Sequence, residues 1–131
     1  MITRFTRALP VALLLCLGAT VPATGSASAA PATAATTCYG GAVTVRYGDA
    51  VEFGPYWTTS RCTDINMRVI GGTADYVNAC VKFAKYGTCN RWTKVGRRWT
   101  TIATDVLNDS KFTVPAGVPL EGDDAVMQIA F

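Results

Sequence analysis

The chain contains no histidine, and this absence limits the chemistry that its side chains can perform. Histidine is the commonest general base, so Ser-His and Cys-His nucleophilic schemes are excluded. Paired carboxylates could still serve a glycosidase. The acidic residues available for such a pair are Asp64, Asp75, Asp105 and Glu121. No pattern sets two of them at the required separation, and no glycine-rich phosphate loop is present. We therefore expect a protein that is not an enzyme and needs no cofactor.

Cysteine is the other residue type with reactive potential. The sequence holds five cysteines, and Cys16 lies in an N-terminal segment that we expect to be removed. The remaining four are an even number, which in an exported chain indicates two disulfides. Four cysteines allow three pairings; proximity favours Cys80–Cys89 and leaves Cys38–Cys62. A zinc site is disfavoured, because there is no Cys-x-x-Cys pair and no histidine.

Oxygen-bearing side chains gather at Asp105, Asn108 and Asp109, and again at Asp123 and Asp124. Carboxylates and amides are ligands of the kind that calcium takes. No EF-hand spacing is present, and the same residue types form turns by bonding their own backbone. We expect no metal, and calcium binding in the 105–109 loop stays an open alternative.

The first candidate for a ligand contact is the aromatic pair Tyr56-Trp57, together with Arg61. The pair follows a Gly-Pro break and lies in a segment rich in hydroxyls, which we expect to form a loop or an edge strand. An exposed loop aromatic can stack on a sugar or contact a partner protein. The alternative is that Trp57 packs over the neighbouring cystine at Cys62.

The second candidate is a basic face. Lys82, Arg91 and Arg98 fall on the polar side of the expected central sheet, with Arg97 in a turn beside them. Such a face could bind an anionic extracellular polymer, for example a wall teichoic acid. The alternative is a solvated surface, since the charges are few and no aromatic residue is expected to face the same way.

The elements that must position these residues are β-strands, and residues 75–104 show the pattern best. Apolar residues occupy alternate positions from Val77 to Phe83, which is the period of a strand with one buried face. Gly96-Arg97 suits a two-residue type II′ turn between two further strands. In that register Trp92 and Trp99 join the apolar side, so we expect both in the core.

Further short strands are expected at residues 42–46, 50–53, 64–70, 111–114 and 125–131. Gly54-Pro55 and Pro115 are expected to interrupt them, because proline cannot donate to a ladder. Short alternating strands separated by turn signals predict an all-β fold. We expect a small antiparallel β-sandwich of the immunoglobulin-like or jelly-roll-like kind, stapled by two disulfides.

The N-terminus has the three parts of a secretory signal peptide. Arg4 and Arg7 precede an apolar run at residues 9–17, and a small-residue cleavage site ends at Ala29. We expect residues 1–29 to be removed, residues 30–37 to be a flexible linker, and residues 38–131 to be one domain. The run is too short to span a bilayer, so no membrane anchor is expected.

Removal of the signal peptide leaves 12 − 2 = 10 basic residues against 9 acidic residues. A nearly neutral chain has no strong overall attraction for nucleic acid or for anionic membranes, so neither is expected as a partner.

The pieces YWTTSRCTDINMR, at residues 56–68, and CNRWTKV, at residues 89–95, resemble small secreted proteins of actinobacteria that carry no assigned function. The resemblance spans the middle of the mature chain. It implies a source and an extracellular compartment, and it carries over no catalytic or ligand residue.

Taken together, these observations predict a secreted, monomeric, non-catalytic binding module for cell-wall or environmental polysaccharide. A secreted inhibitor or toxin-like effector of another protein is a second possibility, and residues 56–61 would be its exposed loop. A small-molecule carrier is a third, and it would need a cavity between the sheets. The expected ligand-binding residues are Tyr56, Trp57, Arg61, Lys82, Arg91 and Arg98.

Overall fold

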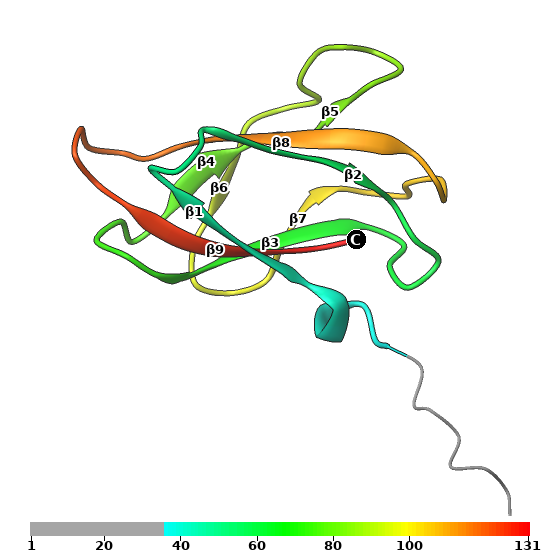
Figure 1. Ribbon diagram of the computed structural model, residues 1–131, viewed down its shortest axis with the longest axis horizontal. Coiled ribbons are helices and arrows are strands. Elements are labelled where there is room, and N and C mark those ends of the chain that lie inside the picture. The colour runs from blue at the N-terminus through cyan, green and yellow to red at the C-terminus, as the bar shows by residue number, and fades with distance from the viewer. Residues whose placement is uncertain (1–35) are drawn as a thin grey trace, which may run out of the picture. The chain divides into compact units, whose positions relative to one another are not determined.

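The computed structural model describes residues 36–131, which form two antiparallel β-sheets packed face to face as a sandwich (Figure 1). One sheet has four strands in the order β1-β9-β3-β7. The other has five, in the order β2-β8-β4-β6, with β5 paired to β8. The elements are a 3-10 turn η1 (Tyr39–Gly41) and strands β1 (Val43–Tyr47), β2 (Glu52–Trp57), β3 (Ile65–Gly71), β4 (Val77–Ala79), β5 (Lys82–Phe83), β6 (Thr93–Val95), β7 (Thr100–Ala103), β8 (Lys111–Gly117) and β9 (Ala125–Ala130). The expected all-β sandwich is confirmed.

The expected signal peptide and most of the expected linker fall on residues 1–35, outside the described residues. Thr37, at the end of that linker, already takes part in local structure. Its carbonyl accepts the Gly41 N–H at 3.1 Å, and its Oγ1 accepts the Gly40 N–H at 3.0 Å. Within residues 36–131, no helix is long and apolar enough to cross a membrane.

The chain changes sheet at nearly every connection. Only β4, β5 and β6 follow one another within the same sheet. As a result, strands far apart in sequence lie side by side, and β9 at the C-terminus pairs with both β1 and β3 (Figure 1). Connections therefore collect at the two ends of the sandwich, where loops from different parts of the chain meet.

The core lies between the sheets and is built from alternate residues of each strand. On β9 the inward side chains are Ala125, Met127 and Ile129, as the alternation predicts. Phe112 on β8 is buried at one end of the core, where it packs edge-on against Phe131 with ring centroids 5.2 Å apart. Burial of each such large side chain contributes about 1.5–3 kcal/mol, so the alternating pattern drives the choice of face.

Both expected disulfides are present. Cys38–Cys62 joins the segment before η1 to the β2–β3 loop, with Cα atoms 4.9 Å apart. Cys80–Cys89 closes the β5–β6 loop, with Cα atoms 5.5 Å apart. Two disulfides indicate an oxidising environment.

The prediction of a hairpin at Gly96-Arg97 is wrong. β6 pairs with β4, where Val95 faces Val77, whereas β7 pairs with β3, where Thr100 faces Met67. Residues 96–99 therefore cross from the five-stranded to the four-stranded sheet. A strand has the same two-residue period whichever sheet it joins, so alternation alone cannot distinguish a hairpin from a crossover.

The placement of Trp92 and Trp99 in the core is also wrong. Trp92 is 59% exposed, and Trp99 is half-buried outside the core, on the outer surface of the four-stranded sheet. Both errors follow from the hairpin, because that register assigned the two rings to the buried face. The first part of the stretch was interpreted correctly, since Val77, Ala79 and Val81 are fully buried.

Gly54-Pro55 and Pro115 were expected to interrupt strands, but both lie within strands. The Gly54–Pro55 bond is cis and sits in β2, where the register with β8 shifts between Phe53 and Tyr56. Pro115 lies within β8, and its carbonyl accepts the Cys80 N–H, just past the end of β4. In an antiparallel strand the N–H and C=O of one residue point the same way. The N–H that proline lacks would therefore have faced the place where β4 has already ended.

Candidate ligand-binding groove

An open cleft of about 520 Å³ lies at one end of the sandwich, between the β5–β6 loop and the β7–β8 loop. In Figure 1 the β5–β6 loop rises at the top of the picture, and the β7–β8 loop lies at the right. A volume of this size falls within the range of small-molecule and sugar sites. The lining residues are Phe83, Ala84, Lys85, Tyr86, Thr104, Asp105, Val106, Leu107, Asp109, Ser110 and Lys111.

Exposed aromatic and apolar side chains stand around this cleft. Tyr86 is 69% exposed on the β5–β6 loop, and Leu107 is exposed on the β7–β8 loop. Trp57, at the end of β2, is 51% exposed and lies beside the cleft, with the Nζ of the lining residue Lys111 5.5 Å from its ring centroid. Three large apolar side chains left in water at one end of a small domain are a feature of interaction sites.

The β5–β6 loop holds Tyr86 in a defined position. The N–H groups of Tyr86 and Gly87 both bond the Phe83 carbonyl, at 3.0 and 2.9 Å, and the Cys80–Cys89 bridge closes the loop behind them. Gly87 has φ 71°, a conformation that glycine adopts without strain.

Asn90 fixes the base of the same loop. Its Oδ1 accepts the Val81 N–H at 2.9 Å, and its Nδ2 donates to the Ile102 carbonyl at 2.8 Å, which links the loop to β7 in the opposite sheet. A loop anchored in this way loses little entropy when a ligand binds.

The β7–β8 loop is anchored from the other side by Thr58, which is buried. The Thr58 Oγ1 donates to the Leu107 carbonyl at 2.5 Å and accepts the Ser110 N–H at 2.9 Å. Asp105 and Asp109 have φ of 49° and 58°, a left-handed conformation that is uncommon outside glycine but tolerated by aspartate. Both residues line the cleft.

A second, shallower hollow of about 360 Å³ adjoins the cleft on the outer face of the five-stranded sheet. The two hollows share Ala84 and Lys111, so they adjoin each other, and we call the pair the end groove. It runs from the β5–β6 and β7–β8 loops onto the outer face of β8.

A polar triad forms the floor of the second hollow. Glu52 Oε1 accepts hydrogen bonds from Lys82 Nζ at 2.5 Å and from Thr113 Oγ1 at 2.6 Å. These two hydrogen bonds hold the pKa of the Glu52 carboxyl below its usual value, and the Lys82 bond is the larger cause. Glu52 is therefore ionised at neutral pH, and it neutralises Lys82.

The remaining charges of the end groove are two lysines, Lys85 and Lys111, and two carboxylates, Asp105 and Asp109. Within residues 36–131, none of these four side chains lies within 4.0 Å of an opposite charge. They are available to hydrogen-bond a ligand. Among residues 36–131, no group of three or more His, Cys, Asp or Glu side chains is placed to hold a metal ion.

The groove brings together only part of the set of ligand-binding residues expected from the sequence. Lys82 lines it and Trp57 flanks it. Tyr56 instead packs inward, with its ring 5.0 Å from the Phe131 ring, and burial raises the pKa of its hydroxyl. Arg61 lies against η1, where a Cβ added to Gly41 would be 3.0 Å from its Cζ.

Arg91 and Arg98 are exposed and line neither hollow. Arg91 lies in the β5–β6 loop and Arg98 in the crossover between β6 and β7, so the expected single basic face with Lys82 is divided between different elements.

Sequence reasoning missed Tyr86, Leu107, Lys85 and Lys111 as groove residues. Tyr86-Gly87 was recognisable as a turn, and an aromatic side chain at the tip of a turn is exposed by its position. The signal for Lys111 was weaker, because a strand that begins with lysine is an ordinary feature.

The end groove offers aromatic surfaces for stacking and both donors and acceptors for hydroxyl groups.

No family model matches the chain, and no curated protein and no solved structure matches it either.

Proposed function

We propose that the protein is a secreted, non-catalytic binding module for extracellular polysaccharide, and that the end groove is its binding site. The observation that carries the proposal is the union of two hollows at Ala84 and Lys111, with the exposed rings of Tyr86 and Trp57 beside them. An elongated site that is open to solvent suits a segment of a polymer chain better than an enclosed small molecule.

The chemistry of the groove matches that of sugars. A pyranose ring presents C–H groups on its faces, which stack on aromatic rings, and hydroxyl groups at its rim, which need hydrogen-bond partners. Tyr86 and Trp57 supply the rings, while Asp105 and Asp109 supply acceptors and Lys111 a donor. Because the loops are already anchored, little conformational entropy is lost on binding.

Retention on insoluble polysaccharides, followed by affinity electrophoresis in soluble ones, tests the proposal. Tyr86→Ala and Trp57→Ala should each weaken binding about tenfold, the upper part of the range for one stacked ring. Leu120→Ala is the matched control, since Leu120 is equally exposed but lies in the β8–β9 connection, outside the groove. No retention by the wild type, or equal binding by all three variants, would reject the proposal.

A second candidate function, inhibition of a secreted enzyme, is favoured by the rigidity of the β2–β3 loop. The loop is held by buried Thr58, by a hydrogen bond from Thr59 Oγ1 to the Phe131 carbonyl at 2.9 Å, and by the Cys38–Cys62 bridge. Rigid exposed loops bind protein partners at low entropic cost. Assays of secreted hydrolases with wild type and Arg61→Ala test this candidate, and an inhibition that the substitution abolishes would support it.

A further inference from the structure

The positive charge of the chain is concentrated in one region. Between Asp75 and Asp105 the sequence contains no acidic residue, although the described domain as a whole is nearly neutral. Four of the cations in this interval lie close together in sequence, on β6 and its two flanks. We call Arg91, Lys94, Arg97 and Arg98 the cationic strip.

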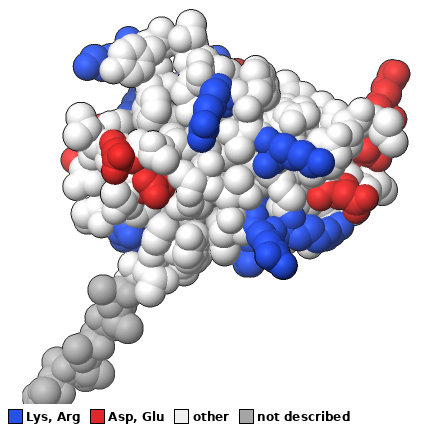
Figure 2. Space-filling view, turned by 180° about the vertical axis from the view of Figure 1, so that it is seen from behind, with Lys and Arg blue, Asp and Glu red and all other residues white. Residues whose placement is uncertain are grey.

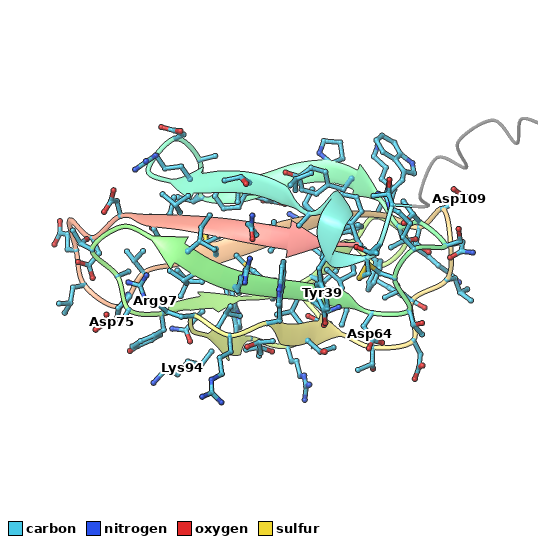
Figure 3. The ribbon with its side chains drawn as sticks, turned by 90° about the horizontal axis from the view of Figure 1, so that it is seen from below. Tyr39, Asp64, Asp75, Lys94, Arg97 and Asp109 are labelled. Carbon is cyan, nitrogen blue, oxygen red and sulfur yellow. A yellow bond between two sulfur atoms is a disulfide. The ribbon has the colours of Figure 1, made fainter. Side chains whose placement is uncertain are left out.

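The cationic strip follows an open edge of the sandwich. β6 is the last strand of the five-stranded sheet, and the crossover that follows it runs along β3, where the Gly96 carbonyl accepts the Val69 N–H at 2.8 Å. Figure 2 shows this side of the molecule, with Lys and Arg spread over the middle and Asp and Glu mainly toward the two ends. Figure 3 shows Lys94 and Arg97 at the same end as Asp75.

These cations are not neutralised within the domain. In residues 36–131, the carboxylates within 4.0 Å of a cation belong to Asp124 and Glu52, and they face Arg46 and Lys82. Lys94 Nζ instead lies 4.1 Å from the centre of the Tyr76 ring. Asp75, although nearby, forms no ion pair with the strip.

β6, which carries Lys94, belongs to the same five-stranded sheet as the second hollow, and Figure 3 shows Lys94 and Arg97 at the opposite end of the sandwich from the groove residue Asp109. Lys94 faces Asn78 on β4, and both point away from the core. Trp92 is two residues before Lys94 on an extended segment, so it shares that outer face, and its ring is exposed. β4 in turn pairs with β8, whose outer face carries the second hollow. A polymer that extends from the second hollow across β4 would reach the outer face of β6, where Trp92 and Lys94 lie.

We infer that the polysaccharide bound by this protein is acidic, and that the cationic strip holds ionised groups of the chain beyond the end groove. The inference rests on the proposed function, and it adds the ligand class and a second contact region. The shared chemistry required of the ligand is a repeated anionic substituent, either a carboxylate or a phosphodiester. Unpaired cations beside an exposed ring attract anionic groups and leave the ring to stack on the sugar.

The competing explanation is that the cations only protect an edge strand from pairing with another chain, as charged residues often do. The two explanations differ in what they require. Edge protection needs no particular ligand, whereas a binding role makes affinity depend on the charge of the polymer and on salt.

The test measures binding of the full domain to dextran, to carboxymethyl dextran of the same length and to poly(glycerol phosphate). We expect the wild type to bind at least one of the two anionic polymers about tenfold or more tightly than dextran, and to lose most of that advantage on raising salt from about 0.05 to about 0.3 M. Arg91→Gln/Arg98→Gln should remove most of the advantage. Arg46→Gln/Arg61→Gln, a pair of the same net charge outside the strip, should keep it.

The possible results distinguish a failure of the inference from a failure of the proposed function. Preference for one anionic polymer identifies the source of the charge. It supports the inference if Arg91→Gln/Arg98→Gln removes the preference and Arg46→Gln/Arg61→Gln does not. Equal binding to neutral and anionic polymers, or equal losses in both variant pairs, would overturn the inference while leaving the proposed function standing. If Tyr86→Ala and Trp57→Ala bind every polymer as tightly as the wild type, the proposed function itself fails. Thermal unfolding of each variant confirms that the fold is retained.

Discussion

The sequence contains the tripeptide Arg-Trp-Thr twice, at residues 91–93 and 98–100, and the two copies have different surroundings. In the second copy, the Trp99 ring stacks on Tyr39 with centroids 4.6 Å apart, and the Arg68 guanidinium lies 4.6 Å from its centre. Arg68 is held in turn by two hydrogen bonds to Gln128 Oε1, at 2.9 and 2.8 Å. The outer face of the four-stranded sheet thus satisfies its own aromatic and cationic groups.

In the first copy, the Trp92 ring is exposed, and within residues 36–131 no aromatic ring or cation stacks on it. The two copies have the same side chains, so composition does not explain the difference. The neighbouring strands do: β3 and η1 bring Arg68 and Tyr39 to Trp99, whereas β4 brings Asn78 to the side of β6 on which Trp92 lies. Trp99 is therefore packed against partners within the domain, whereas the ring of Trp92 is left in water.

The largest effect on the stack of Tyr39, Trp99 and Arg68 is expected from removal of the Cys38–Cys62 disulfide, which holds Tyr39 in place. Cys38→Ala/Cys62→Ala should lower the free energy of unfolding by about 3 kcal/mol, because the unfolded chain gains entropy. It should also release η1 from the sheet and change the near-ultraviolet circular dichroism of Trp99. Urea unfolding measures the first effect. A stability loss below about 1 kcal/mol would show that the packing around η1 suffices without the bridge.

Removal of the stacked ring itself should have the next largest effect. Trp99→Ala should cost about 2 kcal/mol of stability, since it deletes a half-buried ring together with its contacts to Tyr39 and Arg68. Trp99→Phe should recover part of this loss because it restores a ring. Chemical denaturation of the two variants provides the measurement, and equal stability of Trp99→Ala and wild type would show that the stack is incidental.

Substitution of Trp92, in the first copy of the tripeptide, should affect binding more than stability. Trp92→Ala should change the free energy of unfolding by less than about 0.5 kcal/mol, because the ring is mostly in water. It should weaken polysaccharide binding about fivefold, if the ring contacts the ligand as we propose. Unfolding and affinity electrophoresis on the same preparation test both parts. A large stability loss without any binding defect would reverse the roles that the comparison assigns.

The smallest expected effect concerns Glu52 on the outer face of the five-stranded sheet. Its pKa in the folded protein is lowered, chiefly by the hydrogen bond from Lys82 and then by that from Thr113. A lowered folded pKa stabilises the fold above the unfolded pKa, and this contribution is lost as the pH falls through the folded pKa.

Stability should therefore decrease on acidification below about pH 4.5, and Glu52→Gln should show a slightly weaker decrease than wild type. Parallel urea unfolding curves at several pH values measure the difference. A steeper decrease in the variant would contradict the assignment.

Much of the fold could be predicted from the sequence because its strands have one wet and one buried face. Val77, Ala79 and Val81 on one side, and Met127 and Ile129 on another strand, are buried as their alternation requires. Both cystine pairings were predicted from the proximity of the cysteines in the sequence, and both are present. The breaks expected at Gly54-Pro55 and Pro115 were not found. Gly54-Pro55 lies at a register shift within β2, and Pro115 lies in β8 opposite Cys80, just past the end of β4.

The candidate site was less predictable, because it depends on loops that meet only in the folded chain. Trp57 and Lys82 were recognised by residue type and lie at the groove. Tyr56, the neighbour of Trp57, points to the opposite side of the strand and packs near Phe131. Leu107 carries no local signal at all, since it acquires its position from the hydrogen bond between Thr58 and its carbonyl.

The sequence by itself determined the strands, the buried face of most of them and the two covalent bridges, because side-chain alternation and cysteine spacing are local properties of the chain. The tertiary structure alone decided which sheet each strand joins, and with it the separate surroundings of Trp92 and Trp99. The physical reason is that strand pairing satisfies the same backbone hydrogen bonds in either sheet, so the choice rests on packing between residues far apart in sequence.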